Sequence, residues 1–274
     1  MTNDQWQISN IQSQLESAYP KDEAKALAWW IVEEETGLSR SQILSGCKIT
    51  KNFALVQEVI DRLLQFEPIQ YIFGHTEWCG LDLKVTPATL IPRPETAELV
   101  EKITNYQLPI TNCRVLDVGT GSGCIAIALK KAHPEWQVTG IDISSEAIEV
   151  ARENAARNGV EVTFHVADIF SDSIGDFDLV VSNPPYITES EKSSMRPNVL
   201  DFEPHAALFV PDSDPLKFYR RIAELKLGKH LFFEINEAYP AEVSAMLADL
   251  GYTDIHITND IYGKARIIEG RMVG

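Results

Sequence analysis

The sequence predicts an α/β protein with a mostly parallel, seven-stranded sheet that carries helices on both faces, preceded by a small helical bundle. Three observations lead to this fold class. Residues 1 to about 66 show helical spacing, residues from about 94 onward alternate between strand and helix patterns, and the last two strand patterns have no helix between them. We therefore expect a helical domain at 1–67, a β-hairpin and connector at 68–93, and a Rossmann-like domain at 94–274.

The N-terminal region contains two stretches in which apolar residues recur every three to four positions. Gly37 stands directly after the first stretch, where a helix C-cap belongs. This spacing is typical of amphipathic helices that bury one face, so we expect a small helical bundle. The apolar positions are Ala24, Leu27, Ala28 and Ile31 in the first stretch, and Val56, Val59, Ile60 and Leu63 in the second.

The composition changes after Pro68. The following segment, "IQYIFGHTEWCGLDLKVTPATLIPRPET", is rich in glycine, proline and β-forming residues. We expect a short hairpin around Gly80 and then an irregular connector.

The rest of the chain alternates between strand and helix patterns. Strands are expected at "CRVLDVG", "WQVTGID", "EVTFHVAD", "DFDLVVS" and "KHLFFEI", and helices at "GCIAIALKKAH", "SSEAIEVARENAARNG" and residues 241–250. Parallel strands need crossover connections, usually helices, so this order predicts a parallel sheet. The final strands, "YTDIHIT" and "ARIIEG", follow each other directly and predict a terminal antiparallel hairpin.

Composition narrows the class of protein. The chain of 274 residues has a formal net charge of −16, which disfavours a strong non-specific grip on DNA or RNA. Its four cysteines form no CxxC pair and its histidines form no HExxH, so we expect no metal site. Scattered cysteines, a polar N-terminus without signal-peptide features and the lack of a long apolar run predict a cytoplasmic protein without a membrane span.

The segment "LDVGTGSGC" follows a predicted strand and opens a predicted helix. Its glycines, Gly119, Gly121 and Gly123, let the backbone turn sharply and let a ligand approach the main chain. The spacing is G-x-G-x-G rather than the G-x-G-x-x-G of dinucleotide binders, which disfavours a dehydrogenase. Asp117 precedes the first glycine by two residues, and its carboxylate suits an ammonium group better than a pyrophosphate. The alternative is a glycine-rich turn without a ligand.

Acidic residues end the next two predicted strands. Asp142 is placed to accept hydrogen bonds from ribose hydroxyls, or alternatively to cap the helix that begins near Ser144. Asp168 and Ile169 are placed to flank an adenine, or alternatively to act as a helix cap and a core residue. Together with the glycine loop, these residues predict a ligand that is a nucleoside with a positively charged, phosphate-free tail. S-adenosylmethionine (SAM) meets that description, and NAD does not.

The strand "DFDLVVS" leads into Asn183-Pro184-Pro185-Tyr186 at the carboxyl edge of the sheet, where open α/β sheets bind ligands. The prolines fix an extended backbone that cannot continue a ladder or a helix. The side-chain oxygen of Asn183 and the backbone oxygen of Pro184 could each accept one N–H of a planar amino group, and position its nitrogen toward the SAM methyl. Tyr186 could pack against the same group. The alternative is a proline-rich strand exit with a surface tyrosine.

With these motifs, the chain resembles the protein-(glutamine-N5) methyltransferases that modify class 1 peptide chain release factors. The resemblance covers almost the whole chain. The glycine loop and the NPPY tetrapeptide occur in SAM-dependent N-methyltransferases generally, and "IPRPET" between a helical and a catalytic domain is more specific. The matching motifs are "EPIQYIFG", "TLIPRPET", "DVGTGSG", "NPPY", "FEPHAAL" and "ARIIEGR".

The resemblance implies a class I SAM-dependent methyltransferase fold, a substrate-recognising helical domain, and methylation of the glutamine amide in the Gly-Gly-Gln tip of the release factor. SAM would be converted to S-adenosyl-L-homocysteine, without a metal. Two departures stand out: "FVPDSDPL" replaces a glycine-rich step, and Ile169 stands where some members have an aromatic residue. The implied cofactor residues are Asp117, Gly119, Thr120, Gly121, Ser122, Gly123, Asp142, Asp168, Ile169 and Asn183, and the implied substrate residues are Arg93, Glu95, Asn183, Pro184, Pro185 and Tyr186.

Other functions fit parts of the pattern. A DNA adenine-N6 methyltransferase uses the same tetrapeptide but must flip a base from a charged duplex, which the acidic balance and the lack of a basic stretch after Tyr186 disfavour. Methylation of RNA or a ribosomal protein is a related alternative. A non-catalytic SAM-binding protein would not need Asn183. "IPRPET" also fits a helix start with Pro94 at the first position. We expect a monomer that acts on a protein partner and does not bind nucleic acid directly.

Overall fold

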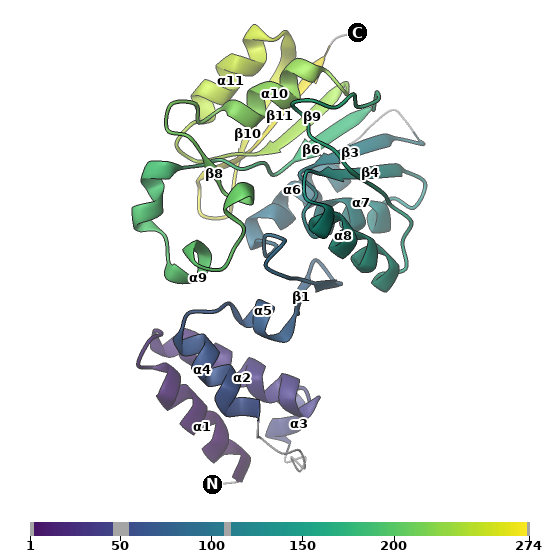
Figure 1. Ribbon diagram of the computed structural model, residues 1–274. Coiled ribbons are helices and arrows are strands. Elements are labelled where there is room, and N and C mark those ends of the chain that lie inside the picture. The colour runs from purple at the N-terminus through teal and green to yellow at the C-terminus, as the bar shows by residue number, and fades with distance from the viewer. Residues whose placement is uncertain (1–2, 46–54, 107–110, 273–274) are drawn as a thin grey trace. The chain divides into compact units, whose positions relative to one another are not determined.

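The computed structural model describes residues 3–45, 55–106 and 111–272, and the chain divides into two compact units (Figure 1). The smaller unit comprises Met1–Phe73 with Pro197–Phe202, and the larger comprises Gly74–Arg196 with Glu203–Gly274. One of the four cysteines, Cys47, lies outside the described residues.

The smaller unit is helical, as the sequence predicts. Its core includes the predicted apolar positions, of which Ala24, Ala28, Ile31 and Ile60 are almost completely buried and Leu27 is partly buried. Gly37 ends the second helix with φ of 66°, and its N–H donates to the carbonyl of Glu33, so the predicted cap is confirmed. The helices are α1 (Asn3–Leu15), α2 (Lys21–Thr36), α3 (Arg40–Leu44), α4 (Val56–Leu64), α5 (Ile69–Phe73) and the short α9 (Pro197–Leu200).

The larger unit begins with the predicted hairpin, formed by β1 (His75–Trp78) and β2 (Leu81–Lys84) around Gly80. Buried Asn154 ties this hairpin to the body of the unit. Its side-chain oxygen accepts from the Lys84 amide at 2.7 Å, and its nitrogen donates to the carbonyls of Lys84 and Ser122, each at 2.9 Å. One side chain thus holds the hairpin against the loop that carries the predicted glycine motif.

The main sheet has seven strands, as predicted, and their order is β10-β11-β9-β6-β3-β4-β5. The five strands from β9 to β5 are parallel, and β11 is antiparallel to both of its neighbours, which confirms the terminal hairpin. The strands are β3 (Arg114–Val118), β4 (Gln137–Asp142), β5 (Thr163–Val166), β6 (Leu179–Ser182), β9 (His230–Glu234), β10 (Tyr252–Asn259) and β11 (Ala265–Met272).

Helices cover both faces of the sheet because its central strands are apolar on both sides. Val115 faces one core cluster and Leu116 faces the other, as the two-residue period of a strand requires. In Figure 1 the sheet lies between α7 and α8 on one side and α10 and α11 on the other. The helices of this unit are α6 (Pro94–Thr104), α7 (Cys124–Ala132), α8 (Ser145–Arg157), α10 (Lys217–Leu225) and α11 (Pro240–Asp249).

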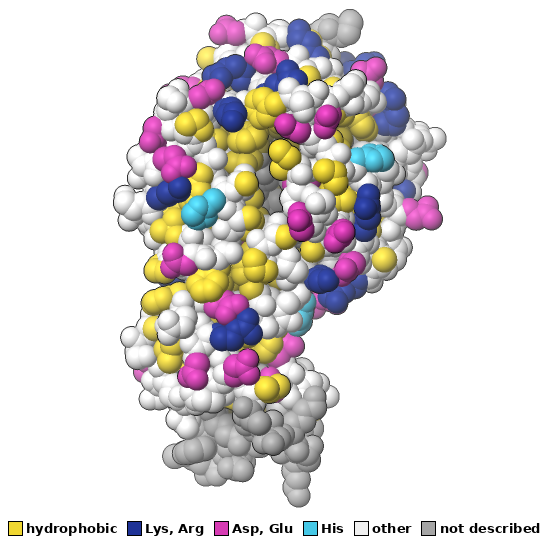
Figure 2. All heavy atoms as spheres, in the orientation of Figure 1, with side chains coloured by type: hydrophobic (Ala, Val, Ile, Leu, Met, Phe, Trp, Pro, Cys, Tyr) yellow, Lys and Arg dark blue, Asp and Glu magenta, His cyan; other side chains and the backbone are white. Residues whose placement is uncertain are grey.

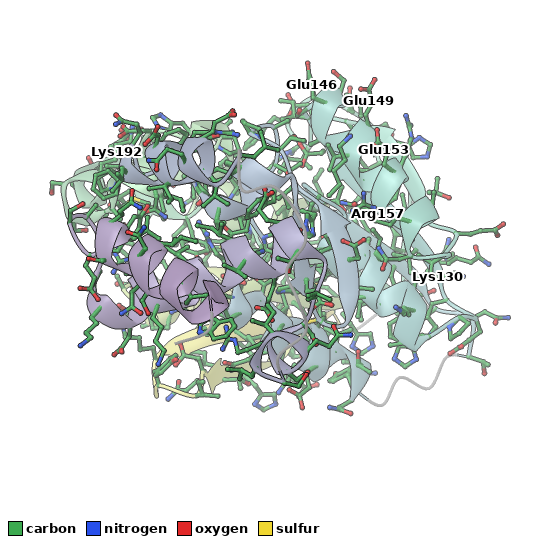
Figure 3. All side chains as sticks on the ribbon, turned by 90° about the horizontal axis from the view of Figure 1, so that it is seen from below. Lys130, Glu146, Glu149, Glu153, Arg157 and Lys192 are labelled. Atoms are coloured by element: carbon green, nitrogen blue, oxygen red, sulfur yellow. The ribbon has the colours of Figure 1, made fainter. Side chains whose placement is uncertain are left out.

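The outer side of α8 is charged. Figure 3 shows Glu146, Glu149, Glu153 and Arg157 following one another along the helix and pointing outward. Two of them form ion pairs with the hairpin, Glu153 with Lys84 at 2.6 Å and Arg157 with Asp82 at 3.2 Å. The buried side of the helix, which includes Ile148 and Ala151, packs on the sheet, so the helix is amphipathic.

The segment between β6 and α10 was not assigned from the sequence. It contains a short parallel pair, β7 (Ile187–Thr188) with β8 (Phe209–Val210), and two 3₁₀ helices, η2 (Glu189–Ser194) and η3 (His205–Ala207). Among the described helices, none is both long and apolar enough to cross a membrane.

Candidate active site

The predicted site residues follow the carboxyl ends of three adjacent strands. In the sheet register, Val118 of β3 lies opposite Ile141 of β4 and opposite Ser182 of β6. The residues that come next, Gly119, Asp142 and Asn183, are therefore at one level of the sheet edge. The order in which the chain adds strands reverses at β3. The strands β4 and β5 follow on one side of β3, and the chain then returns to place β6 and β9 on the other side. This switch point is where open α/β sheets bind ligands.

The glycine loop has the backbone conformation that its composition predicts. Gly119, Gly121 and Gly123 have φ values of 71°, 54° and 80°. A Cβ at Gly119 or Gly121 would meet no atom within 4 Å, which leaves room for a ligand against the main chain. A Cβ at Gly123 would lie 3.0 to 3.2 Å from side chains of Ile127, Ala151 and Phe164, so this glycine is required for helix packing.

Asp117 is a fully buried carboxylate with spare hydrogen-bonding capacity. Its Oδ2 accepts from the Thr120 hydroxyl at 2.6 Å, and its Oδ1 makes no hydrogen bond of ordinary geometry to any described residue. Burial raises the pKa of Asp117 to about 7, and the Thr120 hydrogen bond and the backbone amide of Ala126 oppose that increase. A buried carboxylate oxygen without a partner suits a ligand that brings a cationic N–H, as the ammonium of SAM does.

Asp142 organises the loop that faces it. Its Oδ2 accepts from the Gly121 amide at 2.9 Å and its Oδ1 accepts from the Ser144 amide at 3.0 Å. Burial raises its pKa, and these backbone hydrogen bonds lower it. The alternative interpretation of Asp142 as a helix cap is wrong, because Ser144 is the N-cap of α8 and its hydroxyl accepts from the Ala147 amide.

Asp168 and Ile169 lie beyond the end of β5. The Asp168 carboxylate accepts from the Phe170 amide at 2.9 Å, and its carbonyl accepts from the amides of Ser171 and Asp172, so it opens a tight turn rather than a helix. Ile169 is 7% exposed and belongs to the core cluster under α10, as the alternative interpretation expected. Little of its side chain is open to a ligand.

The NPPY tetrapeptide is held by hydrogen bonds that the sequence analysis did not predict. Asn183 Nδ2 donates to the Thr96 hydroxyl at 3.1 Å, and that hydroxyl donates to Glu234 Oε2 at 2.6 Å. The Tyr186 hydroxyl donates to Glu234 Oε1 at 3.0 Å, and burial raises the pKa of Tyr186. No described residue donates to Asn183 Oδ1 or to the Pro184 carbonyl, so both oxygens can accept from a ligand.

Thr96 and Glu234 are functional candidates that the sequence analysis missed. Thr96 lies within the quoted "IPRPET", next to Glu95, which was singled out in its place. Glu234 ends a strand that is buried along its whole length, "HLFFE", and follows Phe233, which lies opposite Ser182 in the register. An acidic residue directly after the apolar run Leu231–Phe233 was a sequence signal for Glu234.

The structure places Arg93 in an internal ion pair. Its Nη2 lies 2.6 Å from Oε1 of Glu203, whose side chain is completely buried and also accepts from the Ile91 amide. Pro94 is at the start of α6, which confirms the helix-start interpretation of "IPRPET". Glu95 lies in the first turn of that helix and is half-buried.

The surface of the larger unit has a hollow with few basic groups around it. Figure 2 shows a hollow in the middle of this unit, bordered mainly by hydrophobic side chains with acidic groups close by. On the face shown, the described Lys and Arg side chains are scattered rather than gathered along the hollow. Within the described ranges, no group of three or more His, Cys, Asp or Glu is arranged to hold a metal ion.

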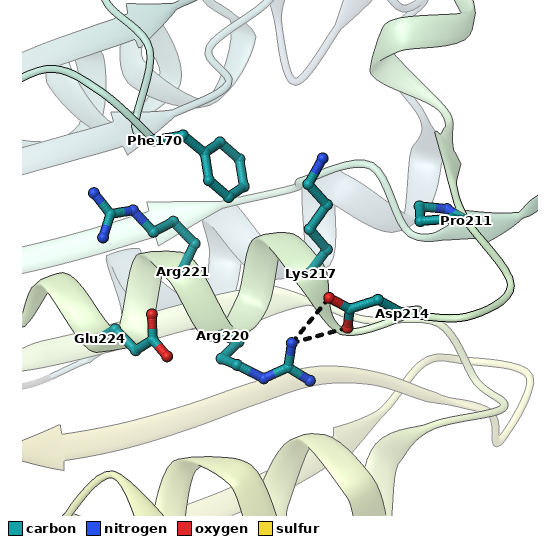
Figure 4. A pocket seen from close by; sticks show the side chains of 7 residues that line it. All are labelled: Phe170, Pro211, Asp214, Lys217, Arg220, Arg221 and Glu224. Atoms are coloured by element: carbon teal, nitrogen blue, oxygen red, sulfur yellow. Dashed lines mark hydrogen bonds and ion pairs between the residues drawn. The ribbon is translucent and has the colours of Figure 1, made fainter.

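A separate surface pocket of about 470 Å³ lies beside α10 (Figure 4). Lys217 Nζ lies 5.0 Å from the ring centroid of Phe170, and Arg220 pairs with Asp214 at 2.8 Å. None of the predicted site residues lines this pocket. Its lining residues are Phe170, Pro211, Asp214, Lys217, Arg220, Arg221 and Glu224.

The fold and the arrangement of these loops define a class I SAM-dependent methyltransferase. A family model for the methyltransferase small domain matches residues 95–200. The catalytic domain of hMettl16 in complex with MAT2A 3′UTR hairpin 6 has the same fold, with a TM-score of 0.56, 17% identity, and coverage of 71% of this chain and 77% of that one. A methyltransferase from Pyrococcus furiosus gives a TM-score of 0.52 at 19% identity, with coverage of 71% of this chain and 90% of that one.

Sequence comparison identifies the family. A model of the PrmC N-terminal domain matches residues 8–74. The release factor glutamine methyltransferase of Bacteroides thetaiotaomicron is 46% identical over 94% of this chain and 96% of its own. The release factor glutamine methyltransferase of Flavobacterium psychrophilum is 40% identical over 96% of this chain and 98% of its own. The chain belongs to the release factor glutamine methyltransferase family.

Proposed function

We propose that this protein transfers a methyl group from SAM to the side-chain amide nitrogen of the glutamine in the Gly-Gly-Gln motif of class 1 peptide chain release factors. The name of its relatives supports the substrate. The observation that carries the chemistry is the pair of open acceptors, Asn183 Oδ1 and the Pro184 carbonyl, at the sheet edge beside the glycine loop.

The cofactor assignment rests on the open oxygen of Asp117, on the Asp142 carboxylate and on the free space beside the glycine loop. Asp117 Oδ1 would accept from the ammonium group, Asp142 would accept from the ribose hydroxyls, and the main chain at Gly119 and Gly121 would lie against the ligand. Thr120, Ser122, Gly123 and Asp168 would complete the proposed pocket, and Ile169 would contribute only the small exposed part of its side chain. When bound, SAM supplies the methyl group and leaves as S-adenosyl-L-homocysteine after the glutamine nitrogen has taken the methyl and released a proton.

The tetrapeptide would solve the problem that an amide nitrogen is a poor nucleophile. A primary amide has two N–H groups, and Asn183 Oδ1 and the Pro184 carbonyl would each accept one. The nitrogen is then held in one orientation, and positive charge that develops on its N–H groups is stabilised by dipoles already in place. Pro185 keeps the segment extended, and the ring of Tyr186 frames the amide plane.

Arg93 and Glu95 would help to close the active site. Because Arg93 is paired with the buried carboxylate of Glu203, we assign it to shaping this segment rather than to direct contact with the release factor. Glu95 stays a proposed contact with the substrate. We further propose a cytoplasmic monomer whose N-terminal helical domain recognises the protein partner, since the relatives are named for a translation factor.

A transfer assay with isotope-labelled SAM tests this function. The purified enzyme is offered a class 1 release factor, duplex DNA that contains adenine, or RNA, in separate reactions. We expect label on the release factor alone. Label on DNA or RNA and none on the release factor would favour the nucleic-acid alternatives, against the formal net charge of −16.

A further inference from the structure

We propose that Glu234 and Thr96 are positioning residues that fix the orientation of the Asn183 side-chain amide, so that its oxygen faces the substrate. This inference deepens the proposed function and rests on it. It starts from a continuous set of hydrogen bonds that joins the NPPY tetrapeptide to α6 and to the end of β9.

The set has three hydrogen bonds and a carboxylate at its centre. Glu234 accepts from the Tyr186 hydroxyl at Oε1 and from the Thr96 hydroxyl at Oε2, over 3.0 and 2.6 Å. Thr96 in turn accepts from Asn183 Nδ2 over 3.1 Å. Thr96 is 2% exposed and Glu234 is 1% exposed, so bulk water cannot replace these partners.

Counting the protons decides which way Asn183 points. An ionised carboxylate can only accept, so the single proton of the Thr96 hydroxyl is directed to Glu234. The Thr96 oxygen is then available to Asn183 only as an acceptor, and Nδ2 is the only atom of the Asn183 amide that can donate. The amide oxygen must therefore lie on the other side, where the glutamine N–H is proposed to bind. Nothing in Asn183 itself sets this choice, because the two ends of an amide have nearly the same shape.

If the hydrogen bonds of this set ran in the opposite direction, methyl transfer would be slowed. If a donor at position 234 faced Thr96, the hydroxyl proton would be directed to Asn183 Oδ1, and Nδ2 would face the substrate. Two N–H groups would then oppose each other in a buried site, and one acceptor for the glutamine amide would be lost. Because Glu234 can only accept, it fixes which atom donates in each of the three hydrogen bonds.

The surroundings of Glu234 favour this role. The Thr96 and Tyr186 hydroxyls donate to its side chain, and the Tyr219 hydroxyl donates to its backbone carbonyl at 3.2 Å. The charged groups that act on it are Arg266 and Glu95. Burial raises the pKa of Glu234, and the Thr96 and Tyr186 hydrogen bonds and the positive charge of Arg266 oppose that increase. Arg266 is itself held by Asp260 at 3.3 Å. Both oxygens of Glu234 already accept a hydroxyl proton, one from Thr96 and one from Tyr186, which is the acceptor role that the argument requires.

The most direct test is Glu234→Gln, which replaces one acceptor oxygen by a donor NH₂ group without changing the size of the side chain. Because Tyr186 donates to one end of residue 234, the glutamine oxygen is expected there, and the NH₂ group then faces Thr96. We expect the single-turnover rate of methyl transfer to a release factor, at saturating SAM, to fall by roughly 10²-fold, the size of effect expected when one preorganised polar contact is lost. SAM affinity and the melting temperature should stay close to those of the wild type.

A second pair of variants keeps the test valid if Glu234→Gln does not fold. Thr96→Val keeps the shape and removes the hydroxyl, so we expect a loss of roughly 10-fold in the same rate, in the range of one lost buried hydrogen bond. Thr96→Ser keeps the hydroxyl, so the rate should return to within about threefold of the wild type. The matched control is Glu269→Gln, a buried carboxylate on the neighbouring strand β11, for which we expect no more than a twofold change.

The outcomes separate this inference from the proposed function. Full transfer by Glu234→Gln, or equal losses in Thr96→Ser and Thr96→Val, would overturn the polarity argument while leaving the function intact. A parallel loss of SAM affinity in Thr96→Val and Glu234→Gln would show a merely structural role and would also overturn it. Failure of the wild-type enzyme to label the release factor would refute the proposed function instead.

Discussion

At the scale of single residues, Asn183 is the side chain whose loss should affect methyl transfer and leave cofactor binding in place. Asn183→Ala removes one of the two acceptors proposed for the glutamine amide, and it also leaves the Thr96 hydroxyl without its donor. We expect transfer to fall by roughly 10²-fold, as for the loss of one preorganised polar contact. Calorimetric titration with SAM should give an affinity close to that of the wild type. Full turnover by this variant would contradict the mechanism.

Asp117 allows a prediction about pH. Its pKa in the folded protein is about 7, above the ordinary value of 3.8. For a group with a raised folded pKa, the stabilising contribution is fully present below about pH 4 and is lost as the pH rises toward 7. Asp117→Asn should therefore be more stable than the ligand-free wild type at pH 8, by up to about 4 kcal/mol, with little difference at pH 4. Urea unfolding at several pH values measures this difference.

The same substitution should weaken cofactor binding. Removing the charge that would meet the ammonium group is expected to lower SAM affinity by roughly 10-fold or more, in line with a charge-assisted hydrogen bond. Calorimetric titration with SAM provides the measurement. An unchanged affinity would show that the open oxygen of Asp117 does not face the ligand.

The sequence predicted most residues of the candidate site but not the residues that hold Asn183 in place. The glycine loop, Asp142 and Asn183 could be predicted because each follows a strand, and parallel strands bring such positions to one edge. Thr96 and Glu234 could not be connected to Asn183 in this way. Their contact with it depends on where α6 lies against the sheet, which no local spacing encodes. Arg93 was singled out without its partner Glu203, which is separated from it by 110 positions.

At the scale of elements, Gly140 links strand packing to the cofactor loop. It lies within β4, where a Cβ would come within 2.7 Å of the Phe164 ring and of the Thr120 hydroxyl oxygen. Gly140→Ala should destabilise the protein by about 1–3 kcal/mol through overpacking. It should also weaken SAM binding, since Thr120 would be displaced from Asp117. Thermal unfolding and SAM titration test both effects, and a variant with wild-type values in both would refute the coupling.

The accuracy of the element predictions followed the strength of the local signals. Strands and helices from β3 to α8 were predictable because apolar runs alternate with amphipathic ones between clear turn residues. Helix α10 was missed although Tyr219, Ile222 and Ala223 have helical spacing. Its boundary signals are weak, because it has no side-chain cap at Leu216 and ends at Lys226 in the left-handed conformation instead of at a glycine. The two-residue strands β7 and β8 are too short to carry a period and are paired with each other only by the tertiary fold.

At the scale of the whole molecule, the excess of acidic residues bears on how a protein substrate would be attracted. The formal net charge of −16 could serve solubility alone or complement a basic surface on the release factor. We expect kcat/KM for the release factor to fall through a higher KM as salt rises from about 0.05 to 0.5 M, because screening shortens the range of attraction. Steady-state kinetics at several salt concentrations provide the test. A constant KM would assign the charge to solubility.

The central claim is that one amide nitrogen of one glutamine receives the methyl group. The most direct measurement is tandem mass spectrometry of a class 1 release factor after incubation with the enzyme and isotope-labelled SAM. The account predicts a single labelled methyl group on the side-chain nitrogen of the Gly-Gly-Gln glutamine, and no label on a factor in which that glutamine is replaced. Label on another residue of the factor, or label that persists after the replacement, would contradict it.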